Sequence, residues 1–484
     1  MFKAAFLTAK ENLQMELISE LWETQLPISL QNLMLKHQLS KSALLRQLHQ
    51  LAPLLHQEQL VLVFTNQTVQ LDHTPEQSFQ IFYLKYLQKT DLFQILRLSL
   101  MQPGLSVAAL SQRLHMGTAT LYRRIHYLNQ SILNEFQLQY QQGELVGSEL
   151  QIRYFYEQFI LAFAQDQVGD RQLFGYTNVT ADQDVLTAIE RFIQDDLSEI
   201  SRGKIRTLLA VYRLRRNARQ WPNFSAFSEN QTFARFAELV RPALNRALGE
   251  PASVSELAAF FLFVITQSIL NFDQPQYRPL FEALERSNHP ICRMMKQLAM
   301  DLSRLNRTWS FNVIRDAVFV AHLRAYWLRG HIISFNRSSG ITVLFRQLSR
   351  NYRLAKKLVT KQQTILAMSD STRALLTYQY ALALRELQQQ ASDRLQIGVA
   401  INLDRSESPT ALRYFEQIIS LFCPAEIELY TPIHTYDLIL ADHEIAHKQT
   451  FIVTDVPLAD DYMNLYQKVE AIYFARFIDE TAID

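Results

Sequence analysis

The stretch SVAALSQRLHMGTATLYRRIHYL, Ser106 to Leu128, decides the fold of the N-terminal part of the chain. Ser106 is placed to cap a short helix that runs to Leu114, and a second helix begins near Thr118 after a turn. Its apolar residues have the spacing that packs two helices across a short turn: Leu110, Leu114, Met116, Leu121 and Ile125. The stretch therefore predicts a helix-turn-helix.

The second of these helices has a polar side that suits nucleic acid. Leu121, Ile125 and Leu128 form its buried stripe, and at about 100° per residue the other positions point away from that stripe. Arginine recognises guanine edges, hydroxyl groups bind phosphate, and a small side chain allows close approach. The DNA contacts predicted from this helix are Thr118, Ala119, Thr120, Tyr122, Arg123, Arg124 and His126.

The same pattern occurs earlier in the chain, displaced by 77 residues. Apolar positions coincide, since Leu33 and Leu44 align with Leu110 and Leu121, and Arg46 aligns with Arg123. Leu45 takes the outward place of Tyr122, so we expect this copy to be the weaker reader and to help position the second. Its predicted DNA contacts are Lys41, Ser42, Arg46 and His49.

A strand-turn-strand pattern follows each helix pair, at 60–71 and at 138–147, with Asn66 and Gly143 at the turns. A hairpin at this place is the wing of a winged helix, and we expect the wing near Gly143 to touch the DNA backbone. Helical hairpins are also common packing units with no role in DNA binding. Duplication with wings at matching places favours two winged helices, 1–72 and 73–160.

The middle of the chain is predominantly helical by its periodicity. A break at ERSNHPICRM, Glu285 to Met294, divides it into units at 165–285 and 286–392. Within it, the run SRGKIRTLLAVYRLRRNARQ, Ser201 to Gln220, carries seven basic residues and no acid. That run indicates either a solvated helix face or a surface for phosphate or for an acidic partner. The acidic segment 395–484, with a net charge of −10, is one such partner.

The periodicity changes near Leu395. LQIGVAINL has the character of a buried strand, SPTALRYFEQIISLF that of a helix, and EIELYT, YDLILAD and FIVTDV those of further strands before a closing helix. This alternation predicts a small α/β domain with a mainly parallel sheet at 393–484. The whole chain is thus expected to be mainly α and multidomain.

This organisation resembles the Mga/AtxA family of Gram-positive transcriptional regulators, most sharply at MGTATLYRRIHYLN, Met116 to Asn129. The resemblance implies two DNA-binding domains, two helical phosphotransferase-system regulation domains (PRDs), and a last domain similar to enzyme IIB of the sugar phosphotransferase system. It also implies contact with phosphocarrier proteins of that system and a regulator of the virulence type. The weak net charge of residues 1–150 suggests modest affinity for each protomer, so we expect a homodimer formed through the later domains, which would link two binding units.

In that family the PRDs are regulated by histidine phosphorylation. No histidine lies between His126 and His289, so the first unit has no acceptor, and the second offers His322 and His331. Packing and hydrogen bonding are the alternative roles for both rings. Enzyme IIB carries a phosphorylated cysteine just after its first strand, whereas this chain has Asp404 and Arg405 there. An interaction or dimerisation role is therefore expected of the last domain.

The segment HEIAH, His443 to His447, matches the HExxH signature of zinc hydrolases. That chemistry needs a helix with both histidines on one face and a third ligand. Because the segment lies between two strand-like runs, we expect a linking loop, and a zinc hydrolase is the enzymatic alternative. We expect no metal and no cofactor.

Composition excludes several other classes. Cys292 and Cys423 lie 131 positions apart, which excludes a cysteine-based zinc site. The longest apolar run, Leu257 to Phe272, has 16 residues, short of the roughly 20 that span a bilayer, so a buried helix is expected. We predict a cytoplasmic, non-enzymatic transcription regulator that binds double-stranded DNA. An RNA-binding antiterminator with similar regulation domains is the alternative.

Overall fold

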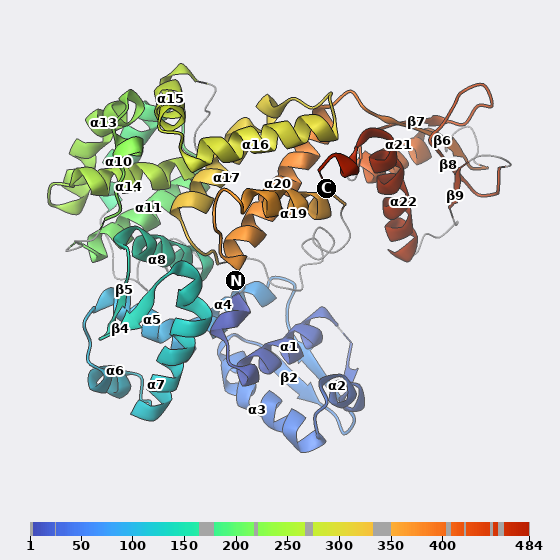
Figure 1. The fold of residues 1–484 in the computed structure, drawn as a ribbon. Helices are drawn as coiled ribbons and strands as arrows, with labels where there is room; N and C mark the ends of the chain where they lie inside the picture. The colour runs from blue at the N-terminus through green and yellow to red at the C-terminus, as the bar shows by residue number, and fades with distance from the viewer. Residues whose placement is uncertain are drawn as a thin grey trace. The chain divides into compact units, whose positions relative to one another are not determined.

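Figure 1 shows a computed structural model of the 484-residue chain. The residues that it describes are 3–24, 26–163, 179–216, 221–266, 274–332, 350–402, 408–420, 423–445, 449–453 and 459–483. The chain divides into two units. Unit 1 comprises Met1–Asn223, Glu238–Leu257 and Gly330–Asn336, and unit 2 comprises Phe224–Ala237, Ala258–Arg329 and Arg337–Asp484.

Unit 1 begins with helices and a small antiparallel sheet. The elements in order are η1 (Lys3–Phe6), α1 (Ala9–Glu23), β1 (Ile28–Ser29), α2 (Leu30–His37), α3 (Lys41–Gln57), β2 (Val61–Phe64) and β3 (Thr68–Asp72). Thr8 starts α1 with a capping box, and Ser29 and Ser40 cap α2 and α3. The sheet order is β1-β3-β2, with Leu62 opposite Leu71. The hairpin predicted at 60–71 is present.

A second set of elements also contains a helix pair followed by a hairpin. It consists of α4 (Phe79–Gln88), α5 (Asp91–Met101), α6 (Val107–Arg113), α7 (Thr118–Tyr127), the turns η2 (Leu128–Ile132) and η3 (Leu133–Phe136), the hairpin β4 (Gln139–Gln141) and β5 (Glu144–Val146), and α8 (Glu149–Phe163). The displacement of 77 residues seen in the sequence extends to the backbone. Ser29 and Ser106 are both N-caps, and Gln38 and His115 both have left-handed φ, 54° and 48°.

Long helices make up the middle of the chain. They are α10 (Val179–Ile193), α11 (Glu199–Leu214), α12 (Ser225–Ser228), α13 (Gln231–Leu248) and α14 (Val254–Thr266). The part of the expected apolar run that the structure describes, Leu257 to Thr266, lies in α14, and every residue from Leu257 to Ile265 is 0% exposed. Residues 267–272 of the run lie outside the described residues. None of the helices in the described ranges has both the length and the apolar character needed to cross a bilayer.

Unit 2 continues with helices and ends in an α/β segment. Its further elements are η4 (Pro275–Tyr277), α15 (Arg278–Arg286), α16 (Pro290–Leu305), η5 (Phe311–Val313), α17 (Arg315–Trp327), α19 (Arg350–Gln362), α20 (Asp370–Gln390), β6 (Leu395–Ala400), α21 (Ser408–Ser420), β7 (Ala425–Leu429), β8 (Leu438–Ala441), β9 (Thr450–Ile452), α22 (Ala459–Phe477) and η6 (Glu480–Ile483). Residues of α16 to α20, of the sheet and of α22 share one buried apolar cluster.

The C-terminal sheet has the order β7-β6-β8-β9, and its strand pairs are all parallel. The expectation of a mainly parallel sheet at 393–484 is confirmed. Asp404 and Arg405 lie outside the described residues. Cys423 is 1% exposed, and burial raises the pKa of its thiol far above the ordinary value. A buried neutral thiol is a poor nucleophile, so Cys423 suits packing better than phosphoryl transfer.

Candidate nucleic-acid interface

Helices α6 and α7 form the second helix pair as the sequence predicts. The backbone N–H of Ala109 donates to Oγ of Ser106 at 3.2 Å, which starts α6. His115 then adopts left-handed backbone torsion and turns the chain toward α7. Leu110 and Leu121 are 1% and 0% exposed, so the apolar side of each helix is buried.

The opposite side of α7 is open to solvent. Tyr122 is 59% exposed, and Nη2 of Arg123 donates to Oγ1 of Thr120 at 3.1 Å, which orients the guanidinium along the helix. Of the predicted contacts, Thr118, Ala119, Tyr122, Arg123 and His126 are exposed and Thr120 is half-buried. We call these six residues the α7 ridge. It offers hydroxyl, phenol, imidazole and guanidinium groups on one face.

Arg124 is placed differently from the other predicted contacts. Its Nε donates to Oδ2 of Asp91 on α5 at 3.0 Å, and its side chain is only 31% exposed. This ion pair holds α7 against α5 through the Nε of Arg124. The assignment of Arg124 to DNA contact stays a prediction.

The second hairpin is short and its tip is packed. Gln142 and Gly143 both have positive φ, 49° and 87°, as a two-residue turn of type I′ requires. Gly143 is buried: a Cβ on it would lie 2.2 Å from the carbonyl oxygen of Leu105. The backbone of the α5–α6 loop covers Gly143 itself, and the expectation that the wing near Gly143 touches DNA stays a prediction. Gln141 and Gln142 at the tip of this wing are exposed, and so are Gln139 and Val146 on its two strands.

Replacing Gly143 by alanine tests this packing. We expect Gly143→Ala to destabilise the protein by about 2 kcal/mol or more, because left-handed strain and a backbone clash add together. Gly104→Ala is the matched control, since Gly104 has φ of 82° but open space around a Cβ, and we expect about 1 kcal/mol. Thermal melting measures both variants, and equal losses would contradict the clash.

The first helix pair presents a smaller polar face. Lys41, Ser42, Arg46 and His49 on α3 are all exposed, as predicted for DNA contacts. The His49 ring lies 5.2 Å from the ring of Phe64 on the hairpin, so the hairpin supports this face. Leu45 is half-buried.

Two exposed basic residues beside the α7 ridge are absent from the DNA contacts predicted from the sequence. His115 is exposed at the turn before α7, and Arg113 ends α6, where its Nη1 donates to Oε1 of Gln102. The sequence pattern of residues 115–117 predicts a turn, and it gives no indication that the His115 imidazole is exposed. Arg113 could have been predicted as a DNA contact, because it is a basic residue in the last turn of α6.

Three arginines of the basic run at 201–220 form ion pairs inside unit 1. Arg202 pairs with Glu190, Arg213 with Asp182, and Nη2 of Arg215 lies 2.8 Å from Oε2 of Glu149. Arg202, Arg213 and Arg215 are at most 20% exposed. Neither a solvated face nor a phosphate-binding surface describes these three arginines, because acidic side chains distant in sequence already hold them.

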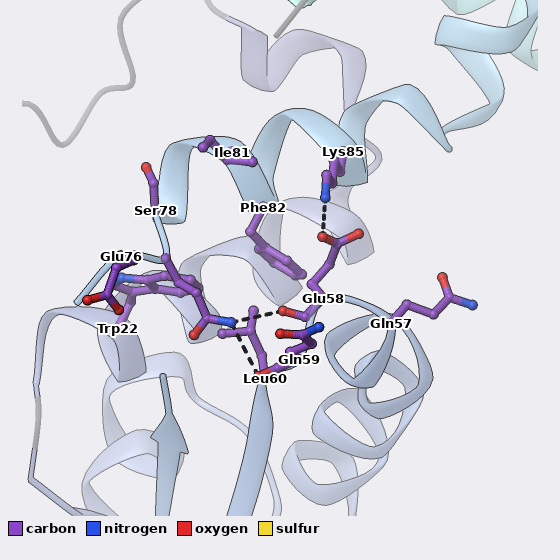
Figure 2. A pocket seen from close by; sticks show the side chains of 11 residues that line it. Trp22, Gln57, Glu58, Gln59, Leu60, Glu76, Ser78, Ile81, Phe82 and Lys85 are labelled. Atoms are coloured by element: carbon purple, nitrogen blue, oxygen red, sulfur yellow. Dashed lines mark hydrogen bonds and ion pairs between the residues drawn. The ribbon is translucent and has the colours of Figure 1, made fainter. Parts of the chain in front are cut away.

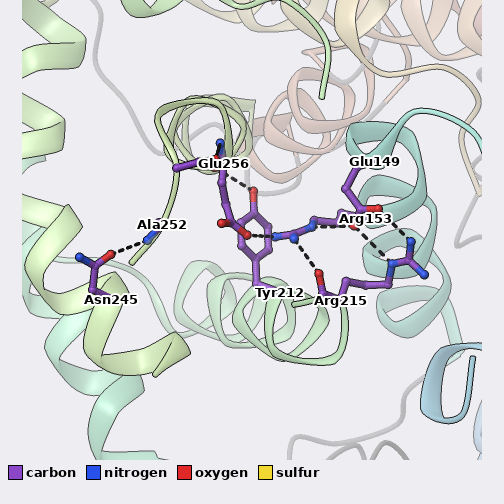
Figure 3. A network of polar contacts seen from close by, with 8 residues as sticks. Glu149, Arg153, Tyr212, Arg215, Asn245, Ala252 and Glu256 are labelled. Atoms are coloured by element: carbon purple, nitrogen blue, oxygen red, sulfur yellow. Dashed lines mark hydrogen bonds and ion pairs between the residues drawn. The ribbon is translucent and has the colours of Figure 1, made fainter. Parts of the chain in front are cut away.

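Arg153 lies at the centre of this buried charge network (Figure 3). Its side chain is 0% exposed; its Nε donates to Glu149 Oε1 at 2.9 Å, and its Nη1 lies 2.9 Å from Glu256 Oε1. The guanidinium stacks 3.8 Å from the centre of the Tyr212 ring. The network, which we call the Arg153 network, joins the start of α8 to α11 and α14.

The two candidate phosphoacceptor histidines differ in access. His322 on α17 is 0% exposed, with Nε2 2.6 Å from Oη of Tyr380. A phosphocarrier protein cannot reach a ring buried in this way, so we correct His322 from an acceptor to a packing residue. His331 is half-buried.

Burial of His322 has a consequence for acid stability. Burial lowers its pKa from 6.5 to about 3, so the folded state holds the ring neutral. Stability from this group is fully present above about pH 6.5 and declines as the pH falls toward the folded pKa. We expect the melting temperature of His322→Gln to fall less steeply between pH 7 and 4 than that of the wild type. If the melting temperatures of the wild type and of His322→Gln fell equally steeply with pH, the conclusion that the His322 ring is buried and neutral would be contradicted.

The HEIAH segment carries no helix over its described part. His443 and Glu444 lie in the loop after β8, and Nδ1 of His443 is 2.6 Å from Oδ1 of Asp442. His447 lies outside the described residues. Within the described ranges, no three or more His, Cys, Asp or Glu side chains are grouped to hold a metal ion.

Comparison with known proteins adds one match. Residues 75–160 match the family model described as the Mga helix-turn-helix domain, which covers α4 to β5 and most of α8. No curated protein matches the chain. The matched family consists of DNA-binding regulators and not of enzymes, so the match supports a DNA-binding transcription regulator.

Proposed function

We propose that the chain is a transcription regulator of the Mga/AtxA type that reads duplex DNA with two tandem winged helix-turn-helix units, 1–72 and 73–160. The observation that carries the proposal is the exposed α7 ridge on a helix whose other side is buried in a helix-turn-helix domain. A helix of this shape fits the major groove of B-form DNA.

Each group of the α7 ridge has a role in this proposal. Arg123 contacts a guanine edge or a phosphate, and Tyr122 and His126 contact phosphates or base edges. The exposed face of α3 makes a second, weaker set of contacts. Residues 1–150 hold 11 basic and 11 acidic residues, so their non-specific electrostatic attraction to DNA is modest. In this proposal, most of the affinity for DNA therefore comes from the side chains of the α7 ridge.

A comparison of nucleic-acid probes tests the function. The full-length protein is incubated with random-sequence duplex DNA and retained molecules are amplified and sequenced. The enriched duplex and an RNA hairpin of equal length are then compared in a gel-shift assay. We expect retention of the duplex alone. Preferential retention of the hairpin would favour an RNA-binding antiterminator, and retention of neither would contradict nucleic-acid reading.

We further propose that the later segments regulate this activity. The PRD-like units are placed at 165–285 and 286–392 and the enzyme IIB-like unit at 393–484, which we assign to homodimerisation. Two linked readers on one duplex would raise the effective affinity. Sedimentation of the full chain tests the dimer, and a monomer that binds the enriched duplex equally well would contradict its role.

Control by phosphocarrier proteins is assigned to His331, because that ring is half-buried while His322 is enclosed. The protein is incubated with phosphotransferase-system phosphocarrier proteins and phosphoenolpyruvate, and peptides are then examined by mass spectrometry at neutral pH. We expect phosphate on His331 and none on the His331→Ala variant. A phosphate found on other residues alone would contradict the assignment.

A further inference from the structure

The two helix-turn-helix segments of unit 1 meet in a joint that contains aromatic side chains. The Trp22 ring at the end of α1 lies 5.7 Å from the ring of Phe79 and 6.2 Å from that of Phe82, both on α4. Figure 2 shows Trp22 and Phe82. Tyr86 Oη on α4 donates to Oε1 of Gln14 on α1 at 2.7 Å, and this bond is buried. The start of the segment that matches the family model is thus fixed to the first helix of the chain.

Polar contacts continue the joint around a cleft of about 370 Å³. Lys85 on α4 pairs with Glu58, which follows α3. Nε2 of Gln77 donates to the carbonyl oxygens of Glu58 and Gln59 at 3.0 and 3.3 Å. Helix α3 is therefore held at its C-terminal end, far along the helix from Lys41 and Arg46.

A second attachment comes from the segment Lys3–Leu7, which we call the N-terminal clasp. Phe6 is 1% exposed, and its ring meets the Phe163 ring edge-on at 4.8 Å and the Phe159 ring at 6.1 Å, both on α8. Tyr127 is the last residue of α7, and its Oη donates to the carbonyl oxygen of Ala5 at 3.0 Å. The clasp thus touches the candidate reading helix itself.

The clasp is also tied to the first helix-turn-helix segment. Nδ2 of Asn12 on α1 donates to the carbonyl oxygens of Ala4 and Leu7 at 3.3 and 3.4 Å. Thr8 forms the capping box that starts α1 immediately after the clasp. One short segment therefore bonds to α1 on one side and to α7 and α8 on the other.

We infer that the N-terminal clasp is a positioning element, which together with the α1–α4 joint holds α3 and α7 as one rigid reader with a fixed spacing. If the helix-turn-helix segments that carry α3 and α7 were joined only by the short link at 73–78, their relative orientation would have to become fixed when DNA binds. The loss of conformational freedom would then lower the affinity. A pre-set spacing removes the cost and restricts the pair to DNA sites with matching separation. The DNA part of this inference rests on the proposed function, whereas the rigid spacing does not.

Distance measurement in the absence of DNA tests the rigid spacing. In full-length protein with Cys292→Ser and Cys423→Ala, spin labels are attached at Asn32→Cys on α2 and Gln112→Cys on α6, which are both exposed. We expect one narrow distance distribution by double electron–electron resonance. The double variant Phe6→Ala, Tyr127→Phe should broaden it, and Phe6→Leu should keep it narrow. Phe281→Ala in unit 2, where a similar aromatic contact is lost, is the matched control and should keep it narrow.

A broad distribution in the labelled parent, or an unchanged narrow one in the folded double variant, would overturn the inference. If the double variant does not fold, Tyr127→Phe alone removes only the bond to Ala5, and an unchanged distribution there would overturn it equally. With the enriched duplex as probe, we expect the double variant to bind about tenfold more weakly and Phe281→Ala to bind as the parent does. Failure of the parent to bind any duplex would contradict the proposed function and leave the distance result standing on its own.

Discussion

Arg153→Met is expected to lower the stability of unit 1 more than any other single change discussed. The substitution removes a cation that is 0% exposed and leaves Glu256 without its partner at 2.9 Å. Removing one member of a buried ion pair costs about 3–5 kcal/mol, because the remaining charge stays desolvated. Loss of the stacking on Tyr212 adds to this. Calorimetry should show a melting transition lower by roughly 6–20 °C.

Arg246→Met is the matched control for this experiment. It removes the same side chain from a pair with Asp184 whose members are 61% and 50% exposed. An exposed pair contributes at most about 1 kcal/mol, so the melting temperature should change little. Similar small shifts in both variants would mean that the Arg153 network adds no more stability than a surface pair.

The helix pairs and hairpins could be predicted because the residues that define each of them lie close together in the sequence. The features that define them, such as Ser106 before α6 and the Leu110–Leu121 spacing, lie within a few turns of each other. The displacement of 77 residues supplied a second, independent copy of the same local signals. Local periodicity also identified the buried helix α14, and the alternation of strands and helices after Leu395 predicted that the C-terminal sheet is mainly parallel.

The contacts that the sequence did not predict join residues that are distant along the chain. Arg124 meets Asp91 33 positions away, and Arg215 meets Glu149 66 positions away, so the sequence alone left both charges looking free. Gly143 was placed at a turn correctly, but the approach of Leu105 to that turn depends on packing. Sequence therefore predicted which face of a helix is polar, and only tertiary structure decided which of its charges remain available.

Arg123→Ala is expected to weaken binding of the enriched duplex by about 1–3 kcal/mol, roughly five- to 150-fold, if the guanidinium reads a base. Arg123 is exposed and bonds only to Thr120 among the contacts described for it, so its loss should leave the melting temperature unchanged. Arg124→Ala should behave in the opposite way, lowering the melting temperature through the loss of the Asp91 pair. Fluorescence anisotropy with labelled duplex and thermal melting separate the two effects.

Arg123→Lys distinguishes a base contact from a phosphate contact. Lysine keeps the charge but lacks the planar fork that donates two bonds to guanine, so a base reader should lose affinity and sequence preference together. A phosphate contact should survive this substitution with little loss. Arg278→Ala provides the control, since Arg278 is 81% exposed and pairs with Glu282 in unit 2. Unchanged affinity in a folded Arg123→Ala protein would mean that the α7 ridge does not read DNA through this residue, and the reading helix would then have to be sought in α3.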